Sequence, residues 1–85
     1  MKTIIREMRG IPFFLLKEYL EEMGGKSLNE NQVQGPGWTV DMSRMEPFKI
    51  GSLSIGQTLL EIQIEDHAVD DFLKVFGQKT LRAGG

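Results

Sequence analysis

Cysteine is absent from this 85-residue sequence, and only one histidine, His67, is present. The lack of cysteine excludes disulfides, thiolate metal sites, iron–sulfur clusters and a cysteine nucleophile within the chain. It also agrees with a reducing compartment, and we predict a cytoplasmic protein. A serine hydroxyl needs a base beside it to act as a nucleophile, and only one histidine is present to serve all of the serines. We therefore expect no catalytic centre and no enzyme activity from this chain alone.

Long apolar runs and an excess of positive charge are missing too. The longest apolar block, residues 11–16, contains Pro12 and is far shorter than the roughly 20 residues of a membrane span. Arg6, Glu7 and Arg9 stand where a signal peptide needs an apolar run. Lysine and arginine number 10 against 12 acidic residues, which gives a net charge of −2. Because nonspecific nucleic-acid binding depends on basic patches, we expect no nucleic-acid partner and no membrane.

What is present is the composition of a folded chain, with 40% hydrophobic and 26% charged residues. Its length is enough for one hydrophobic core and too short for two. We therefore predict a single domain over residues 1–80, followed by a flexible C-terminal tail over residues 81–85.

Two amphipathic helices are predicted. The first follows Pro12, which suits the first turn of a helix, and ends at Gly24-Gly25, where a left-handed cap favours glycine. The second begins with Asp66 as N-cap and ends at Gly77. Leu81 is predicted to dock beside this helix as the last anchored residue. Apolar residues at helical spacing form their buried faces: Phe13, Leu16, Leu20 and Met23, then Val69, Phe72, Leu73 and Phe76.

Strands are predicted before and between these helices. Residues 3–5 are β-branched, and residues 38–43 and 58–65 alternate between apolar and polar side chains. Gly35-Pro36-Gly37 predicts a type II turn before Trp38, which we interpret as a core anchor. Residues 26–34 are polar and fit either an edge strand or a loop.

The region between the two alternating runs contains two further turn signals. Apolar residues change parity at Gly51-Ser52, which predicts a β-bulge there. Gly56-Gln57 has glycine first, as a type II′ hairpin turn requires.

This order of elements predicts the fold class α+β, with the order β-α-β4-α. Two helices cover only one face of such an antiparallel sheet, so both should lie on one face and leave the other in water. The side chains expected on the open face are polar and lean acidic: Thr39, Asp41, Ser43, Glu61, Gln63 and Glu65.

The stretches GPGW, KIGSLSI and LRAGG, in that order and spacing, resemble the small domain appended to the C-terminus of MoaD-related proteins of molybdopterin biosynthesis. The resemblance implies a TATA-binding-protein-like fold and a link to molybdopterin or sulfur-transfer proteins. It implies no catalytic residue and no cofactor. DNA binding by the open face is not expected here, because Asp41, Glu61 and Glu65 would repel phosphates.

The C-terminal LRAGG also resembles the end of ubiquitin-like proteins and sulfur carriers. A flexible Gly84-Gly85 pair can enter the channel of an adenylating enzyme, and in that case the tail is the modified end of the protein. The sulfur carriers with a β-grasp fold place a hairpin before their first helix, whereas only one strand is predicted here. A mobile, unmodified end is therefore our first expectation, and modification at Gly84 and Gly85 is the alternative.

His67, Asp70 and Asp71 share one face of the second helix at metal-ligand spacing. We interpret them instead as a helix start with acids placed for the helix dipole, and we predict no metal site. Four methionines, Met8, Met23, Met42 and Met45, fill a packed core or line a cavity between helix and sheet.

These observations predict a non-catalytic accessory or protein-interaction domain, monomeric or weakly dimeric, with an unknown protein partner. Two alternatives stay open: a small-ligand-binding domain with a helix–sheet cavity, and a carrier acting through Gly84 and Gly85.

Overall fold

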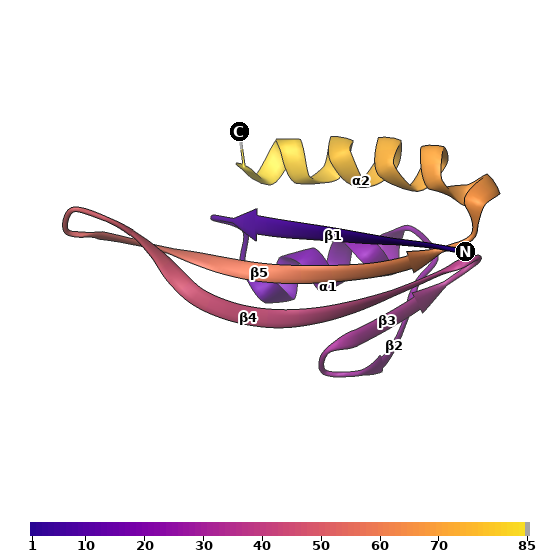
Figure 1. Ribbon diagram of the computed structural model, residues 1–85, viewed down its shortest axis with the longest axis horizontal. Coiled ribbons are helices and arrows are strands. Elements are labelled where there is room, and N and C mark those ends of the chain that lie inside the picture. The colour runs from indigo at the N-terminus through magenta and orange to yellow at the C-terminus, as the bar shows by residue number, and fades with distance from the viewer. Residues whose placement is uncertain (85) are drawn as a thin grey trace.

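The computed structural model describes residues 1–84, and the surroundings of the side chains for residues 1–81. The described residues form one five-stranded antiparallel sheet of order β1-β5-β4-β3-β2 and two α-helices (Figure 1). Along the chain the elements are β1 Lys2–Arg9, α1 Phe13–Glu22, β2 Lys26–Asn29, β3 Gln32–Gly35, β4 Trp38–Ile50, β5 Leu53–Ile64, a 3-10 turn at Asp66–Ala68 and α2 Val69–Gly84. The predicted α+β class and the order β-α-β4-α are confirmed.

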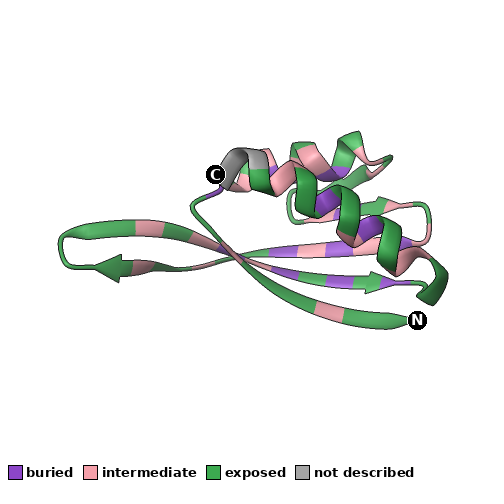
Figure 2. Cartoon of the chain, turned by 90° about the horizontal axis from the view of Figure 1, so that it is seen from above, coloured by how far each residue is buried: buried purple, intermediate pink, exposed green. Residues whose placement is uncertain are grey.

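Both helices pack on one face of the sheet. Leu16 and Leu20 of α1 and Phe72 and Phe76 of α2 belong to a single buried cluster. The sheet contributes alternate residues to this cluster: Val33 from β3, Trp38, Val40 and Met42 from β4, and Leu60, Ile62 and Ile64 from β5. Figure 2 shows the buried positions gathered where the helices lie against the strands. The predicted buried faces are confirmed.

Helix α1 ends where the two glycines predict it. Gly24 has φ of +95°. The Gly25 N–H donates to the Leu20 carbonyl at 3.0 Å, and the Gly24 N–H donates to the Glu21 carbonyl at 3.1 Å. This pair of bonds is the Schellman arrangement that satisfies the last carbonyls of a helix.

The segment Gly35-Pro36-Gly37-Trp38 joins β3 to β4 by a tight turn. Gly37 has φ of +80°, as the third position of a type II turn requires, so the predicted turn is confirmed. Gly35 lies opposite Trp38 in the ladder, and a Cβ there would stand only 2.1 Å from the Trp38 Cζ2 atom. The indole therefore packs over bare backbone, and it meets Phe72 edge-to-face at 5.1 Å between ring centroids.

Residues 26–34, which the sequence left open between strand and loop, lie in the hairpin of β2 and β3. Ser27 Oγ donates to the Asn29 carbonyl at 2.9 Å, and the Asn31 N–H donates to Asn29 Oδ1 at 2.8 Å. These local bonds shape the turn between two short strands that carry only one buried residue, Val33.

The two turn predictions between residues 44 and 57 are wrong. The hairpin turn lies at Gly51-Ser52, where Gly51 has φ of +57° and Ile50 pairs with Leu53. Gly56-Gln57 lies inside β5. The bulge lies in β4. Met45 pairs with Gln57 and Phe48 pairs with Ile55, so β4 has two residues between these pairs where β5 has one.

Helix α2 also differs from prediction at both ends. Asp66 is no side-chain N-cap; it lies in the 3-10 turn with a carboxylate oxygen 3.5 Å from the amino group of Met1. Gly77 lies inside the helix, so the cost of about 1 kcal/mol for a glycine at an interior position does not end it there. Lys79 pairs with Glu22 of α1 at 2.7 Å, and Leu81 is exposed rather than docked. The predicted domain limit at residue 80 and the flexibility of residues 81–85 stay predictions, and Gly85 lies outside the described residues.

None of the helices in the described residues is both long and apolar enough to span a membrane.

Candidate functional site

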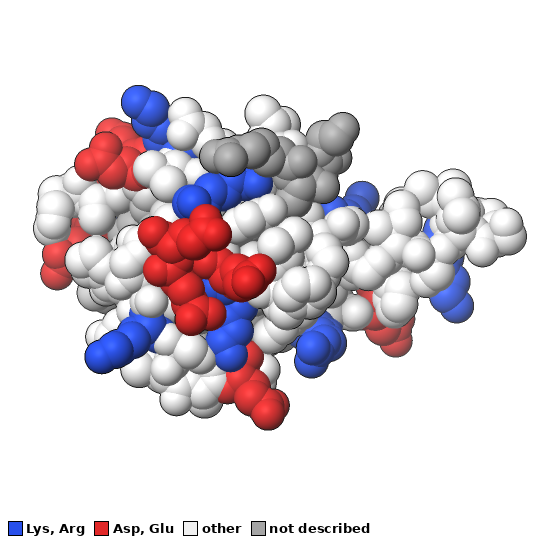
Figure 3. Space-filling view, turned by 180° about the vertical axis from the view of Figure 1, so that it is seen from behind, with Lys and Arg blue, Asp and Glu red and all other residues white. Residues whose placement is uncertain are grey.

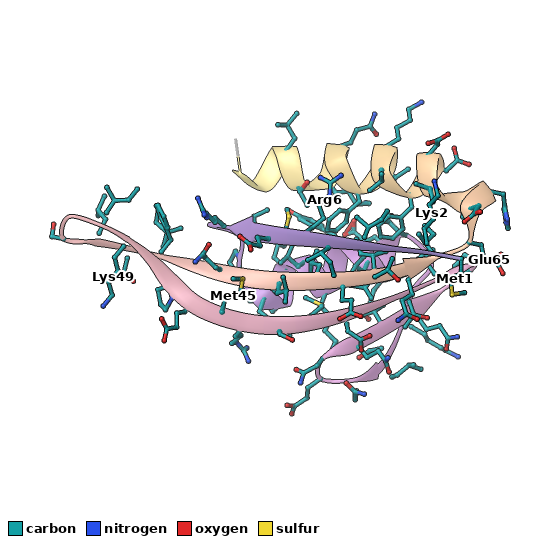
Figure 4. All side chains as sticks on the ribbon, viewed as in Figure 1. Met1, Lys2, Arg6, Met45, Lys49 and Glu65 are labelled. Carbon is teal, nitrogen blue, oxygen red and sulfur yellow. The ribbon has the colours of Figure 1, made fainter. Side chains whose placement is uncertain are left out.

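The longest projection of the molecule is a two-stranded arm. Strands β4 and β5 pair with each other far beyond the rest of the sheet, and β1 accompanies β5 only as far as the Arg9–Gln57 pair. Residues 46–56 therefore extend from the body as a hairpin, here called the arm (Figure 1). Figure 4 places Lys49 on the arm and Met45 nearer the body, with Glu65 at the opposite end of the molecule.

The arm exposes apolar side chains on one face. Phe48 lies opposite Ile55, and Ile50 lies opposite Leu53, so that the two cross-strand pairs stand next to each other. Ile50 is 54% exposed and Leu53 is 66% exposed. Neither residue belongs to the core cluster. Ile50 and Leu53 therefore present apolar surface to the solvent, as residues of an interaction site do.

Arg9 is held in place at the base of the arm. Its Nε donates to Gln57 Oε1 at 2.7 Å, and its guanidinium lies over the ring of Phe48 at 4.2 Å from the centroid. Gln57 is fixed in turn, because its Nε2 donates to the Glu46 carbonyl at 2.8 Å. A second guanidinium, that of Arg44, lies 4.3 Å from the ring centroid of Phe13.

Positive charge dominates this end of the molecule. Among the described residues, no carboxylate lies within 4.0 Å of a nitrogen of Arg9, Arg44 or Lys49. In Figure 3 the arm extends to the right as a largely uncharged surface, with basic side chains along it and an acidic group near its base. Acidic side chains gather on the body in the same view.

Two hollows lie where the arm meets the body. One has a volume of about 330 Å³ and is lined by Gly10, Ile11, Pro12, Ser54, Ile55 and Gly56. The other, of about 240 Å³, includes Phe13, Arg44, Met45 and Pro47 in its wall. Both lie beside the segment in which the chain leaves β1 for α1.

The open face of the sheet continues from the arm over the body. Register places Thr39 opposite Gln63, Asp41 opposite Glu61 and Ser43 opposite Leu59, as the predicted alternation requires. Asp41 accepts a hydrogen bond from Gln32 Nε2 at 2.9 Å. Because Asp41 and Glu61 face each other with like charges, this part of the sheet repels anions.

A third hollow, of about 420 Å³, lies at the end of the molecule opposite the arm. Its apolar wall is formed by Met23, Pro36, Trp38, Phe72 and Val75, with Glu22, His67 and Asp71 among its polar lining. Glu22 already pairs with Lys79, and His67 lies 3.5 Å from Glu65. This groove is the structural basis for a small-ligand alternative.

The residues that sequence reasoning weighed as sites are not brought together. No three histidine or acidic side chains in the described residues converge in a way that would hold a metal ion, including His67, Asp70 and Asp71. Trp38 is buried as the predicted core anchor. The proposal that Gly84 and Gly85 are modified is untested, because Gly85 and the surroundings of Gly84 fall outside what the structure describes.

Sequence reasoning missed the arm. Its apolar residues, Phe48, Ile50, Leu53 and Ile55, entered the sequence analysis only through the change of parity at Gly51-Ser52. The signal that distinguishes the arm from the strands of the body is its proline and glycine content. Pro47 and Gly51 lie in the arm, whereas residues 38–43 and 57–65 contain neither proline nor glycine.

The model of one protein family, described as archaeal MoaD-like protein, matches residues 4–85. The chain belongs to this archaeal MoaD-like family. The match spans the arm, its base and both helices, and it confirms the resemblance to MoaD-related proteins. A comparison with curated proteins gave no match. The MoaD-like family connects the chain with molybdopterin and sulfur-carrier proteins.

Proposed function

We propose that this protein is a non-catalytic interaction module that binds a protein partner of molybdopterin or sulfur-transfer chemistry through the arm. The observation that carries the proposal is the apolar face of the arm, with Ile50 and Leu53 more than half exposed on a segment outside the core. Apolar residues gathered on a surface mark interaction sites in folded proteins. Family membership supports the choice of partner class.

A nucleic-acid partner is not proposed. The acidic side chains of Asp41 and Glu61 lie on the same face of the sheet as the apolar side of the arm. A phosphate backbone laid across that face would meet negative charge instead of releasing its counterions.

Replacing Ile50 and Leu53 together by glutamate should abolish capture of the partner by the tagged protein in its native cells. Two buried charges would have to be desolvated in the complex, which is costly without partners. Capture followed by mass spectrometry measures the loss. The control is Phe14→Glu with Leu28→Glu, two residues that are 67% and 53% exposed outside the arm.

The control variant should recover the same proteins as the unaltered chain. Equal recovery by the arm variant, or recovery of no protein related to molybdopterin or sulfur transfer, would rule out the proposed function.

A sulfur carrier acting through Gly84 and Gly85 is the second candidate, favoured by the MoaD-like family. The terminal carboxylate would then be adenylated and converted to a thiocarboxylate. One strand, β1, precedes the first helix, unlike the hairpin of the β-grasp carriers. We therefore expect the unmodified intact mass for protein isolated from its native cells. A species heavier by one sulfur-for-oxygen exchange, lost when both glycines are deleted, would establish the carrier instead.

Small-ligand binding remains a further alternative, and the groove beside Trp38 and Phe72 supports it. The groove's volume of about 420 Å³ falls within the usual range for ligand pockets.

A further inference from the structure

We infer that the base of the arm binds an acidic segment of the partner protein. A carboxylate of that segment pairs with Arg9, and an apolar side chain next to it enters the hollow beside Ile55. This inference rests on the interaction function proposed above and adds the chemistry that the partner must present.

Arg9 is preorganised for a carboxylate. A guanidinium has five N–H donors, and here the Nε donor is used by Gln57 Oε1 while the Phe48 ring supports the planar group from one side. The terminal nitrogens at the far edge of the guanidinium have no carboxylate within 4.0 Å among the described residues. Two parallel N–H···O bonds to one carboxylate match that edge. Because the side chain is already fixed, little rotamer entropy is lost on binding.

Two residues that line the hollow beside Ile55 connect it to Arg9. Gly10, which follows Arg9 in the chain, lines it, and Ile55 lies opposite Phe48, the residue under the guanidinium. Its lining includes no charged side chain, and its volume is about 330 Å³. A segment with a carboxylate and an aliphatic or aromatic side chain side by side would therefore meet both features at once.

The charge of the surroundings favours an acidic segment. Over residues 7–10 and 44–57, Arg9, Arg44 and Lys49 carry three positive charges against two negative charges, Glu7 and Glu46. This end therefore has a net charge of +1, and the remaining residues carry −3, which gives the total of −2. Glu7, Asp41 and Glu61 on the body side limit the approach of a long polyanion, so a short acidic segment is favoured over a nucleic acid.

The test uses the full chain labelled with ¹⁵N and a blocked peptide of sequence Gly-Leu-Glu-Gly-Leu-Glu-Gly, titrated at low salt. We expect the amide signals of Phe48, Ile55 and Gln57 to shift with the peptide. Replacing both glutamates of the peptide by glutamine should weaken binding about tenfold or more, since a bidentate charged pair is lost. Arg9→Gln should have the same effect, and Arg9→Lys should fall between, because lysine keeps the charge without the planar fork.

The matched control is Lys26→Gln, which removes a cation from β2 and should leave the peptide affinity unchanged. Several outcomes would overturn the inference: equal binding of the glutamate and glutamine peptides, no effect of Arg9→Gln in a variant that melts normally, no binding at all, or Arg9-dependent binding of a DNA duplex with greater affinity than the peptide. Shifts of the same amides with protein concentration alone would assign the site to a second copy of the chain instead.

The two proposals fail separately. Capture in cells that depends on Ile50 and Leu53 but not on Arg9 would overturn the acidic segment and leave the interaction function standing. Peptide binding at Arg9 without arm-dependent capture would remove the interaction function and keep only a carboxylate site.

Discussion

Replacing Gly35 by alanine is expected to lower the free energy of unfolding by about 3 kcal/mol, the upper end of the range for overpacked sites. The new Cβ would stand 2.1 Å from Trp38 Cζ2 and 2.2 Å from Trp38 Cε2, far inside van der Waals contact. The indole also contacts Phe72 and lies close to Gly25, so a shift away from the new Cβ would disturb this packing. Urea denaturation measures the change, and the melting temperature should fall by roughly ten degrees or more.

Gly56→Ala is the matched control for this substitution. Gly56 also lies in a strand, but a Cβ there meets nothing within 4 Å. Its stability should stay the same or rise by up to about 1 kcal/mol, because alanine has less conformational freedom in the unfolded chain. Equal destabilisation by both alanines would show that Gly35 is not required for the seating of Trp38.

Leu60 and Leu53 both lie in β5, but replacing them by alanine should change the free energy of unfolding by very different amounts. Leu60→Ala is expected to cost about 2–5 kcal/mol, because Leu60 is fully buried in the core and its removal leaves a cavity. Leu53→Ala should cost less than about 0.5 kcal/mol, because Leu53 lies on the arm with most of its surface in water. Urea denaturation of both variants makes the comparison.

The result bears directly on function. A small effect at Leu53 means that folding does not account for an apolar residue at that position, which leaves binding as the reason for it. A cost of several kcal/mol at Leu53 would show that the arm is packed in solution and would remove the main support for an interaction site.

The body of the fold was predictable because its residues follow local rules. Period-2 alternation through Trp38, Val40 and Met42 identified β4, and Gly24-Gly25 identified the end of α1. The contact between Gly35 and Trp38 was not predictable, because a glycine in a turn motif gives no sign of which side chain crosses it. The clash appears only when the register of β3 and β4 is known.

The arm was misread for a related reason. An extra residue in β4 between Met45 and Phe48 shifts the alternation, so that Phe48 and Ile50 face the side of the sheet opposite to Val40 and Met42. The change of parity at Gly51-Ser52 is the ordinary result of a two-residue turn. Whether apolar strand residues are covered depends on how far the helices reach, which no local pattern records.

The bulge and Pro47 also bear on aggregation. Among the described residues, β3 pairs with β4 only as far as Asp41, so the outer edge of β4 is bare along the arm, and bare edges are templates for fibril growth. Residues 50–55 consist of three large apolar residues, one glycine and two serines without a charge, a composition that favours cross-β stacking. A proline without an N–H, a bulge and the charges of Glu46 and Lys49 interrupt the edge immediately before them. The arm can therefore expose apolar side chains on one face, while the proline, the bulge and the charges hinder the addition of another strand at its edge.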